Sequence, residues 1–199
     1  MHVYEVRPRK RRIKRTFVNP ADAGLWISAD VRSFRRGKEK ITKRPIIYKW
    51  WFRKQIVPLL LKPLTYEVDM NRIEYKKRYG LLYIGRAKNG HARRINYHIF
   101  DSSNFHKKGV ENGRLSSLRQ TLCGLLRCKM STACGRVNKF MDKNCKIEWR
   151  IVDDSAALLK NEAAEIKSHY LPLNYQHTKH ILTPNHRKIL SALKKRARR

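Results

Sequence analysis

Two tyrosines, one glutamate and a basic segment are the residues of this sequence whose types could together perform chemistry. Tyr48 and Tyr83 each lie in a short apolar run, Ile46-Ile47-Tyr48 and Tyr83-Ile84-Gly85, and Glu162 lies in a later segment with helical periodicity. Hydrolysis of a phosphodiester requires a base for the attacking water, stabilisation of charge on the phosphoryl oxygens and help for the leaving group. Tyrosine, arginine, histidine and glutamate can supply these functions only where a fold brings them together.

Taken singly, these residues have plainer interpretations. A tyrosine in a strand is usually a packed residue whose hydroxyl reaches the rim of the core. Arg93 and Arg94 would be ordinary phosphate contacts, and His98 a surface residue. A glutamate at the border of a helix's apolar face commonly pairs with a Lys or Arg, and the sequence pattern by itself favours that ion pair over a metal ligand.

The charge of the chain indicates its partner. Among 199 residues, 47 Lys and Arg stand against 15 Asp and Glu, which gives a formal net charge of +32. Without residues 1–15 and 187–199 the chain retains 33 Lys and Arg against 14 acids, or +19, so the folded body itself is basic. A basic face of this kind indicates a nucleic-acid partner. We expect no membrane partner, since the sequence has neither an 18-residue apolar run nor a lipidation motif.

Three strands are predicted from period-two alternation of β-branched and aromatic residues, over residues 46–52, 79–86 and 147–152. Residues 53–77, between the first two strands, form a Leu- and Pro-rich insertion. The chain thus divides into a basic N-terminal extension (1–40), a folded body (41–182) and a basic C-terminal helix or tail (183–199).

Helical periodicity predicts four helices. A short helix after Gly90 places Arg94 and His98 on one flank and Arg93 on the other. A second helix begins at Ser116 and carries Arg119 beside its apolar stripe, and a basic helix begins near residue 186. The remaining helix follows the third strand.

In that remaining helix, Asp153, Asp154 and Ser155 are N-cap candidates, and the helix is predicted to run to about residue 170. At 100° per residue, Glu162 lies roughly 70° from the centre of the apolar face and Glu165 roughly 130° away. Glu162 is therefore predicted at the border of the core and Glu165 in solvent. A carboxylate beside a phosphate-binding face favours an intervening cation, typically Mg²⁺. The apolar face is predicted from Leu159, Ala163, Ile166 and Tyr170.

The order of these elements resembles the GIY-YIG endonuclease superfamily, over about residues 44–182. Ile46-Ile47-Tyr48 matches the first motif except that Ile46 replaces its glycine, and Tyr83-Ile84-Gly85 matches the second. The stretch YIGRAKNGHARRINYH is similar to the family's passage from strand to helix, where Arg94 and His98 fit best and Arg93 lies one residue away. The stretch NEAAEIKSHYLPLN is similar to the closing helix, with Glu162 twelve residues before Asn174. The stretch SSLRQTLCGLL resembles a segment of small bacterial members.

The resemblance implies a role for each matching residue. Glu162 would hold a single divalent metal, Mg²⁺ or Mn²⁺, on the scissile phosphate. Tyr48 and Tyr83 would flank the attacking water, one of them as general base or its positioning partner. Arg94 would stabilise the developing negative charge, and His98 would help deprotonate the nucleophile or orient a tyrosine. Asn174 would make a hydrogen bond that fixes the site, and the products would be a 5′-phosphate and a 3′-hydroxyl.

The implied fold is a small α/β (α+β) domain with a central three-stranded antiparallel sheet flanked by helices. DNA, expected as a duplex, would be the partner, and a homodimer would cut both strands. The expected location is the cytoplasm, in association with a nucleoid, with a nucleus as the alternative. The insertion would carry target recognition or a dimer contact, so deleting residues 57–75 should spare the fold. The alternative function is a nucleic-acid-binding protein on the same scaffold that does not cut. The expected nucleic-acid-binding residues are Arg86, Lys88, Arg93 and Arg119.

Overall fold

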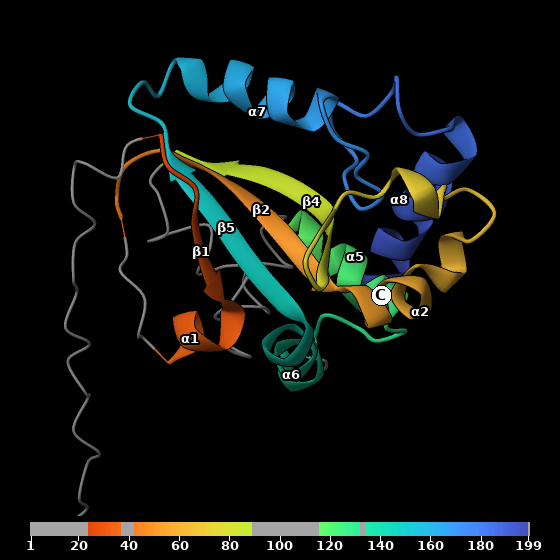
Figure 1. The fold of residues 1–199 in the computed structure, drawn as a ribbon. Helices are drawn as coiled ribbons and strands as arrows, with labels where there is room; N and C mark the ends of the chain where they lie inside the picture. Colours follow the sequence, from red (N-terminus) through yellow and green to blue (C-terminus); the bar gives the residue numbers. More distant parts are fainter. Residues whose placement is uncertain (1–23, 37–41, 89–115, 132–133, 199) are drawn as a thin grey trace, which may run out of the picture.

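A five-stranded antiparallel sheet forms the centre of the computed structural model, which describes residues 24–36, 42–88, 116–131 and 134–198 (Figure 1). The strand order is β1-β5-β2-β4-β3. The strands are β1 (Ile27–Asp30), β2 (Ile46–Arg53), β3 (Tyr75–Lys76), β4 (Tyr79–Ala87) and β5 (Cys145–Ile151).

The three predicted strands are the three central strands of this sheet, but the expected total of three is wrong. The additional strands β1 and β3 lie at the two edges and contain four and two residues. Strands this short carry too few alternating positions for a periodic signal, and β1 lies in a segment that was expected to be an unpatterned extension. The sheet is therefore wider than the sequence indicates.

The central strand β2 explains the aromatic character of its sequence. Seven of its eight residues are buried, because β4 and β5 flank it and helices cover both faces. Tyr48, Trp50 and Phe52 belong to the core on one face, whereas Ile47 and Trp51 belong to the core on the other. A strand covered on both sides favours large apolar residues, and β2 has them at all its buried positions except Lys49.

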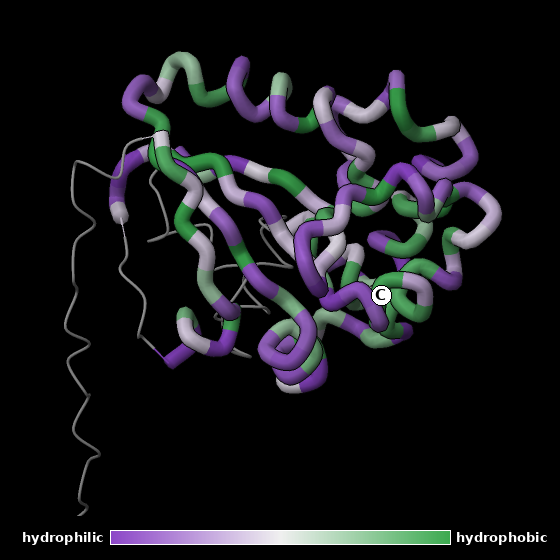
Figure 2. The backbone as a smooth tube through the Cα atoms, in the orientation of Figure 1, coloured by the Kyte–Doolittle hydropathy of each residue, from purple (hydrophilic) through white to green (hydrophobic). Residues whose placement is uncertain are grey.

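Helices cover the two faces unequally (Figures 1 and 2). The helix α7 (Ala157–Lys167) packs on one face, together with the smaller core cluster. The main core lies on the other face, where five helices contribute buried residues. These five are α1 (Val31–Arg35), α2 (Val57–Leu61), α5 (Ser117–Leu125), α6 (Cys134–Asn144) and α8 (Pro184–Arg198).

The helix predicted at Ser116 is confirmed. The Ser116 hydroxyl oxygen accepts a hydrogen bond from the Arg119 backbone N–H at 3.1 Å, so Ser116 is the N-cap of this helix. Its predicted apolar stripe, Leu118, Leu122 and Leu125, is buried. The basic C-terminal helix is also confirmed and begins at Pro184. The helix predicted after Gly90 lies outside the described residues. Among the described helices, none is long and apolar enough to cross a membrane.

The insertion between β2 and β4 is part of the main core. It forms α2 and three short 3₁₀ turns, at Lys54–Ile56, Lys62–Leu64 and Met70–Arg72. Each buried aliphatic side chain contributes about 1.5–3 kcal/mol. The core position of the insertion argues against the expectation that deleting residues 57–75 would spare the fold. The side chains it would remove from the core are Val57, Leu60, Leu61, Leu64, Val68 and Ile73.

Candidate active site

Three consecutive residues of β4 (Ile84, Gly85 and Arg86) are contacted by three of the predicted site residues. The first contact is that of Asn174, which is 3% exposed. Its side-chain oxygen accepts a hydrogen bond from the Ile84 N–H, and its side-chain amide donates to the Ile84 carbonyl, both at 2.9 Å. Because β3 pairs with β4 only at Tyr79 and Gly80, the edge of β4 is open at Ile84, and Asn174 takes the place of a neighbouring strand there.

The second contact is between Tyr48 and Gly85, which lie directly opposite each other in the β2–β4 register. A Cβ atom at Gly85 would lie only 2.7 Å from the Tyr48 hydroxyl oxygen and 2.8 Å from its Cζ. The tyrosine ring therefore crosses over the backbone of β4 at the one position that has no side chain. The glycine of the second motif is required by the tyrosine of the first.

Tyr83 lies on the same face of the sheet as Tyr48. It is opposite Trp50, so the two tyrosines are diagonal neighbours on adjacent strands, and Tyr83 is half-buried against the main core. The register shifts between Trp50 and Trp51, which leaves Leu82 as the extra residue on β4, immediately before Tyr83. The long insertion thus leaves the two motif strands paired.

The third contact is between Glu162 of α7 and Arg86. The Arg86 Nε lies 2.6 Å from the Glu162 Oε2, and Glu162 is 8% exposed. The buried face of α7 consists of Leu158, Glu162 and Ile166, whereas Leu159 of the predicted face is 49% exposed. The buried face of α7 is thus rotated from the predicted one, and it includes Glu162 because Arg86 of the sheet pairs with that carboxylate.

The ends of α7 also differ from the prediction. The cap position is Ala156, without a side-chain hydrogen bond, and the Asp154 carboxylate instead accepts from the Ala156 backbone N–H at 2.7 Å. The helix ends at Lys167, three residues earlier than predicted. The predicted capping residue Asp154 therefore lies in a turn before the helix and is not the N-cap.

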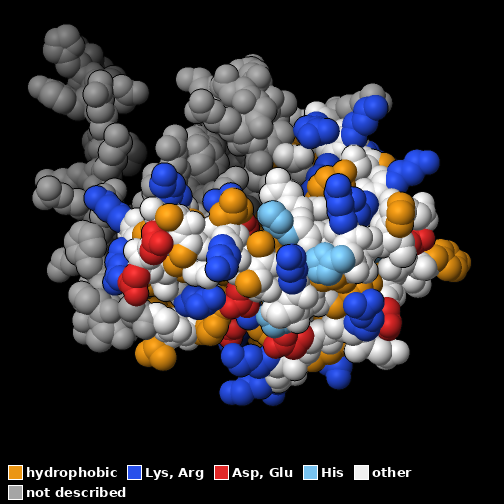
Figure 3. Space-filling view, turned by 90° about the horizontal axis from the view of Figure 1, so that it is seen from above, with side chains coloured by type: hydrophobic (Ala, Val, Ile, Leu, Met, Phe, Trp, Pro, Cys, Tyr) orange, Lys and Arg blue, Asp and Glu red, His pale blue; other side chains and the backbone are white. Residues whose placement is uncertain are grey.

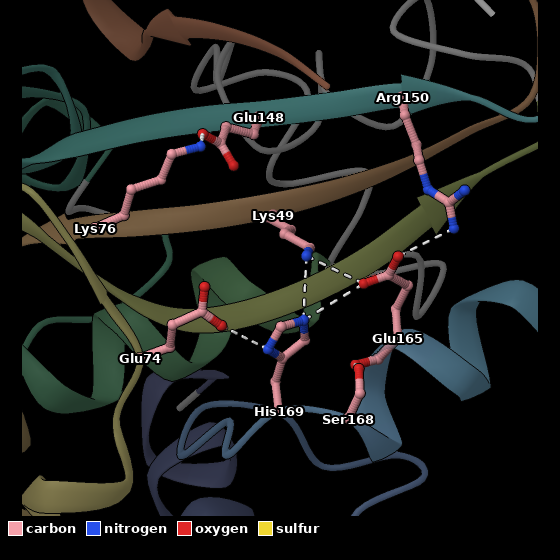
Figure 4. A network of polar contacts seen from close by, with 8 residues as sticks. All are labelled: Lys49, Glu74, Lys76, Glu148, Arg150, Glu165, Ser168 and His169. Carbon is pink, nitrogen blue, oxygen red and sulfur yellow. Dashed lines mark hydrogen bonds and ion pairs between the residues drawn. The ribbon is translucent and has the colours of Figure 1, made fainter. Parts of the chain in front are cut away.

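Glu165 was predicted in solvent, and this is wrong. Its carboxylate lies 3.1 Å from the Lys49 Nζ, 3.0 Å from an Arg150 nitrogen and 3.4 Å from the His169 Nε2, while the other nitrogen of His169 lies 2.7 Å from Glu74 (Figure 4). The hydrogen bond with His169, followed by that with Lys49, lowers the pKa of Glu165 to about 2 although burial opposes the change. This network fastens α7 to β2 and β5.

The charged and aromatic parts of the candidate site lie on opposite faces of the sheet. Tyr48 and Tyr83 belong to the face of the main core, whereas Arg86 points toward α7, where it meets Glu162. The two parts come closest in sequence along β4, where Gly85, which lies under Tyr48, is followed directly by Arg86. In the part of the chain that the structure describes, no three His, Cys, Asp or Glu residues lie close enough together to hold a metal by themselves.

The remaining predicted residues differ in their placement. Lys88 is exposed just beyond the end of β4. Arg119 is 1% exposed, and its guanidinium donates to the Asn138 side-chain oxygen at 2.9 Å, so it is not placed to bind a phosphate, contrary to the prediction. Arg119 is buried because its helix, α5, packs against both α6 and α8. Arg93, Arg94 and His98 lie outside the described residues.

Two groups of polar residues near the site were not predicted. One is the network of Glu165, whose only sequence signal is Lys49, a lysine inside an otherwise apolar strand. The other is a set of basic side chains around Tyr175, between the end of α7 and α8. Neither group has a spacing in the sequence that marks it, because its members come from separate elements.

The fold and the β4 site together define a small mixed α/β catalytic domain. A family model described as the GIY-YIG catalytic domain matches residues 46–196 of the chain. The match covers most of the sequence, so the chain belongs to the GIY-YIG family, which is a family of nucleases acting on nucleic acids. Comparison with curated proteins and with solved structures gave no significant match.

Proposed function

We propose that this protein is a metal-dependent endonuclease that hydrolyses phosphodiester bonds of DNA and leaves a 5′-phosphate and a 3′-hydroxyl. The observation that supports the proposal is the convergence of Asn174, Tyr48 and Glu162 on three consecutive residues of β4. This arrangement brings a phenol and a carboxylate to neighbouring residues of one strand, which Asn174 holds in place.

Glu162 is the residue that would bind the divalent ion. Its Oε2 accepts a hydrogen bond from the Arg86 Nε, and Oε1 is the carboxylate oxygen that the ion would bind. Mg²⁺ and Mn²⁺ are usually held by one or two carboxylates together with substrate phosphates and water, so a single carboxylate oxygen is a sufficient donor from the protein. Such an ion would neutralise charge on the scissile phosphate and lower the pKa of a bound water.

The other residues would act on the water and on the phosphate. Tyr48, with its hydroxyl above Gly85, is the proposed general base or its positioning partner, and Tyr83 is its neighbour on the same face. Arg94 would stabilise negative charge in the transition state, and His98 would orient a tyrosine or accept a proton. Asn174 would keep the β4 edge straight through its two bonds to Ile84.

Incubation with supercoiled plasmid tests the proposal. Wild-type protein should nick the plasmid with Mg²⁺ or Mn²⁺ and not with EDTA. The isosteric variant Glu162→Gln should lower the rate by about 100-fold or more, because a neutral amide cannot offset the charge of the ion. Asp153→Asn is the matched control, since Asp153 is an exposed acid that pairs with Arg44, and it should cut like the wild type. Failure of the wild type to nick any DNA under varied metals would overturn the proposal.

A non-catalytic nucleic-acid-binding protein is the second candidate function. The observation that favours it is the 2.6 Å ion pair itself, because Arg86 already supplies the buried Glu162 with a structural partner. Under this alternative, Glu162→Gln would reduce stability without any cleavage to lose. The proposal of an endonuclease also includes duplex DNA as its substrate and a homodimer as the unit that cuts both strands. Sedimentation velocity of the protein bound to a short duplex would measure whether it is a dimer.

A further inference from the structure

Two adjoining hollows lie on either side of Tyr175, between the loop of residues 175–180 and α8. The first has a volume of about 530 Å³ and the second about 510 Å³, and both are lined by Tyr175 and Arg187. The first hollow is also lined by Arg86, which is the partner of Glu162, so it opens next to the candidate site. We call the two together the Tyr175 groove.

The lining of the Tyr175 groove is positively charged. No acid lines either hollow, and His177 and His180 line the first of them. Figure 3, which looks onto the side of the molecule where α7 lies, shows histidines with Lys and Arg side chains near them and some acidic side chains further round. A cluster of like charges destabilises the fold unless an anion offsets it. The six cations that line the groove are Arg86, Lys167, Lys179, Arg187, Lys188 and Lys195.

The loop beside the groove is rigidly built. Thr178 is fully buried, its hydroxyl donates to the Tyr175 carbonyl at 3.1 Å, and its own carbonyl accepts the backbone N–H groups of Ile181 and Leu182. His177 has φ of +58°, a left-handed conformation that is costly for a residue with a side chain. The loop begins directly after Asn174, which is fastened to Ile84. The position of the groove is therefore tied to β4.

Arg187 is the charged residue that both hollows share, and a guanidinium group suits a phosphate. Its guanidinium carbon lies 4.8 Å from the centre of the Tyr175 ring, and its Nε is buried without a hydrogen-bond partner among the described residues. The Lys194 Nζ also lies 4.8 Å from that ring. Because two cations already lie against Tyr175, the groove suits the phosphates of a strand better than bases stacked on the ring.

We propose that the Tyr175 groove binds the sugar–phosphate backbone of a nucleic-acid strand on the α8 side of the β4 edge. The groove would hold phosphates that flank the position beside Glu162 and so set which bond of the strand reaches that residue. The inference rests on the proposed function in one respect, that the bond beside Glu162 is the one that is cut. Binding of the strand in the groove does not depend on cleavage.

Binding without metal tests the groove separately from catalysis. The variant Lys179→Gln/Lys188→Gln/Lys195→Gln removes three exposed charges of the groove. The control Arg136→Gln/Lys139→Gln/Lys143→Gln removes three exposed charges from α6, which Figure 1 shows at the opposite end of the molecule from α7. Affinity for fluorescein-labelled DNA is measured by anisotropy in EDTA over a series of salt concentrations. Each phosphate contact contributes about 0.9 to the slope of log K against log salt, so the groove variant should lower the slope by about 2–3 and the affinity about tenfold or more.

Equal losses in the groove and α6 variants would overturn the inference, because the binding would then follow net charge alone. Unchanged binding of the labelled DNA by the groove variant would also overturn it. A wild type that binds through the groove but never cuts would instead remove the proposed function and leave the groove. Circular dichroism of both variants would check that they are folded.

Discussion

The Tyr48 hydroxyl occupies the space that a side chain at Gly85 would need. The tyrosine comes from the first motif of the family and the glycine from the second, and the two residues lie opposite each other on β2 and β4. The motifs are therefore two halves of one packing arrangement. The first motif of this chain has Ile46 where the family has glycine, and the Ile46 side chain is buried in the main core.

Gly85→Ala should displace the Tyr48 ring, because the added carbon would lie 2.7–2.9 Å from three of its atoms. Overpacking of this size costs about 1–3 kcal/mol. We expect a lower midpoint in urea unfolding together with a large loss of plasmid nicking.

Gly80→Ala is the matched control for this substitution. Its added carbon would lie 2.9 Å from an atom of the Tyr75 ring, at the end of β4 remote from the site residues. It should lower stability by a similar amount and leave the nicking rate of the folded protein unchanged. Equal losses of activity in the two variants would show that Tyr48 matters for folding only.

Asn174→Asp should weaken the edge of β4. The substitution keeps the acceptor for the Ile84 N–H but replaces the donor with an oxygen that faces the Ile84 carbonyl. An unsatisfied buried polar group costs about 1–3 kcal/mol, so we expect a loss of stability in that range. Hydrogen exchange measures the local effect: the Ile84 amide should exchange faster relative to amides of β5. Unchanged protection would contradict the role of Asn174 as a substitute for a strand.

The network of Glu165 predicts a stability that falls in acid. The pKa of this carboxyl is about 2 in the folded protein against a reference of 4.5, so its contribution is complete above pH 4.5 and is lost as the pH falls toward 2. Urea unfolding at several pH values between 2 and 6 should show a steeper decline for the wild type than for Glu165→Gln. Parallel curves for the two proteins would mean that Glu165 does not titrate differently on folding.

Arg119→Gln should affect stability and not nucleic-acid binding. The buried guanidinium of Arg119 donates to Asn138, and its loss leaves polar groups unsatisfied at a cost of about 1–3 kcal/mol. The slope of log K against log salt for DNA binding should stay that of the wild type, since no phosphate contact is removed. A reduction of that slope by about one unit would place Arg119 at the nucleic-acid interface after all.

The sequence predicted the parts of the fold whose signals are local. The strand around Trp50 alternates large apolar residues over its whole length, and Ser116 caps a helix with a regular leucine stripe, so both elements were found. The edge strands were missed because residues 27–30 and 75–76 depend on pairing with neighbours that are distant in sequence.

The errors at the candidate site have the same origin. The helical angle of Glu165 predicts that it faces solvent. Lys49 of β2 and Arg150 of β5 nevertheless reach its carboxylate where α7 packs on the sheet. Arg119 looks like a surface cation until α6 packs over it. Polar residues of either sign can be buried when a partner of opposite charge or a hydrogen-bond acceptor comes from another element, and only the fold supplies that information.

The core position of the insertion has a consequence for folding kinetics. Tyr48 and Gly85 are 37 residues apart in the sequence, and the chain between them must be closed into a loop before their strands can pair. Because buried residues of that loop, such as Leu61 and Leu64, pack in the same core as Tyr48, the loop cannot remain loose while the strands pair. The contacts of Tyr48 with Gly85 should therefore form late, together with the domain as a whole, so that partly folded chains lack the assembled site.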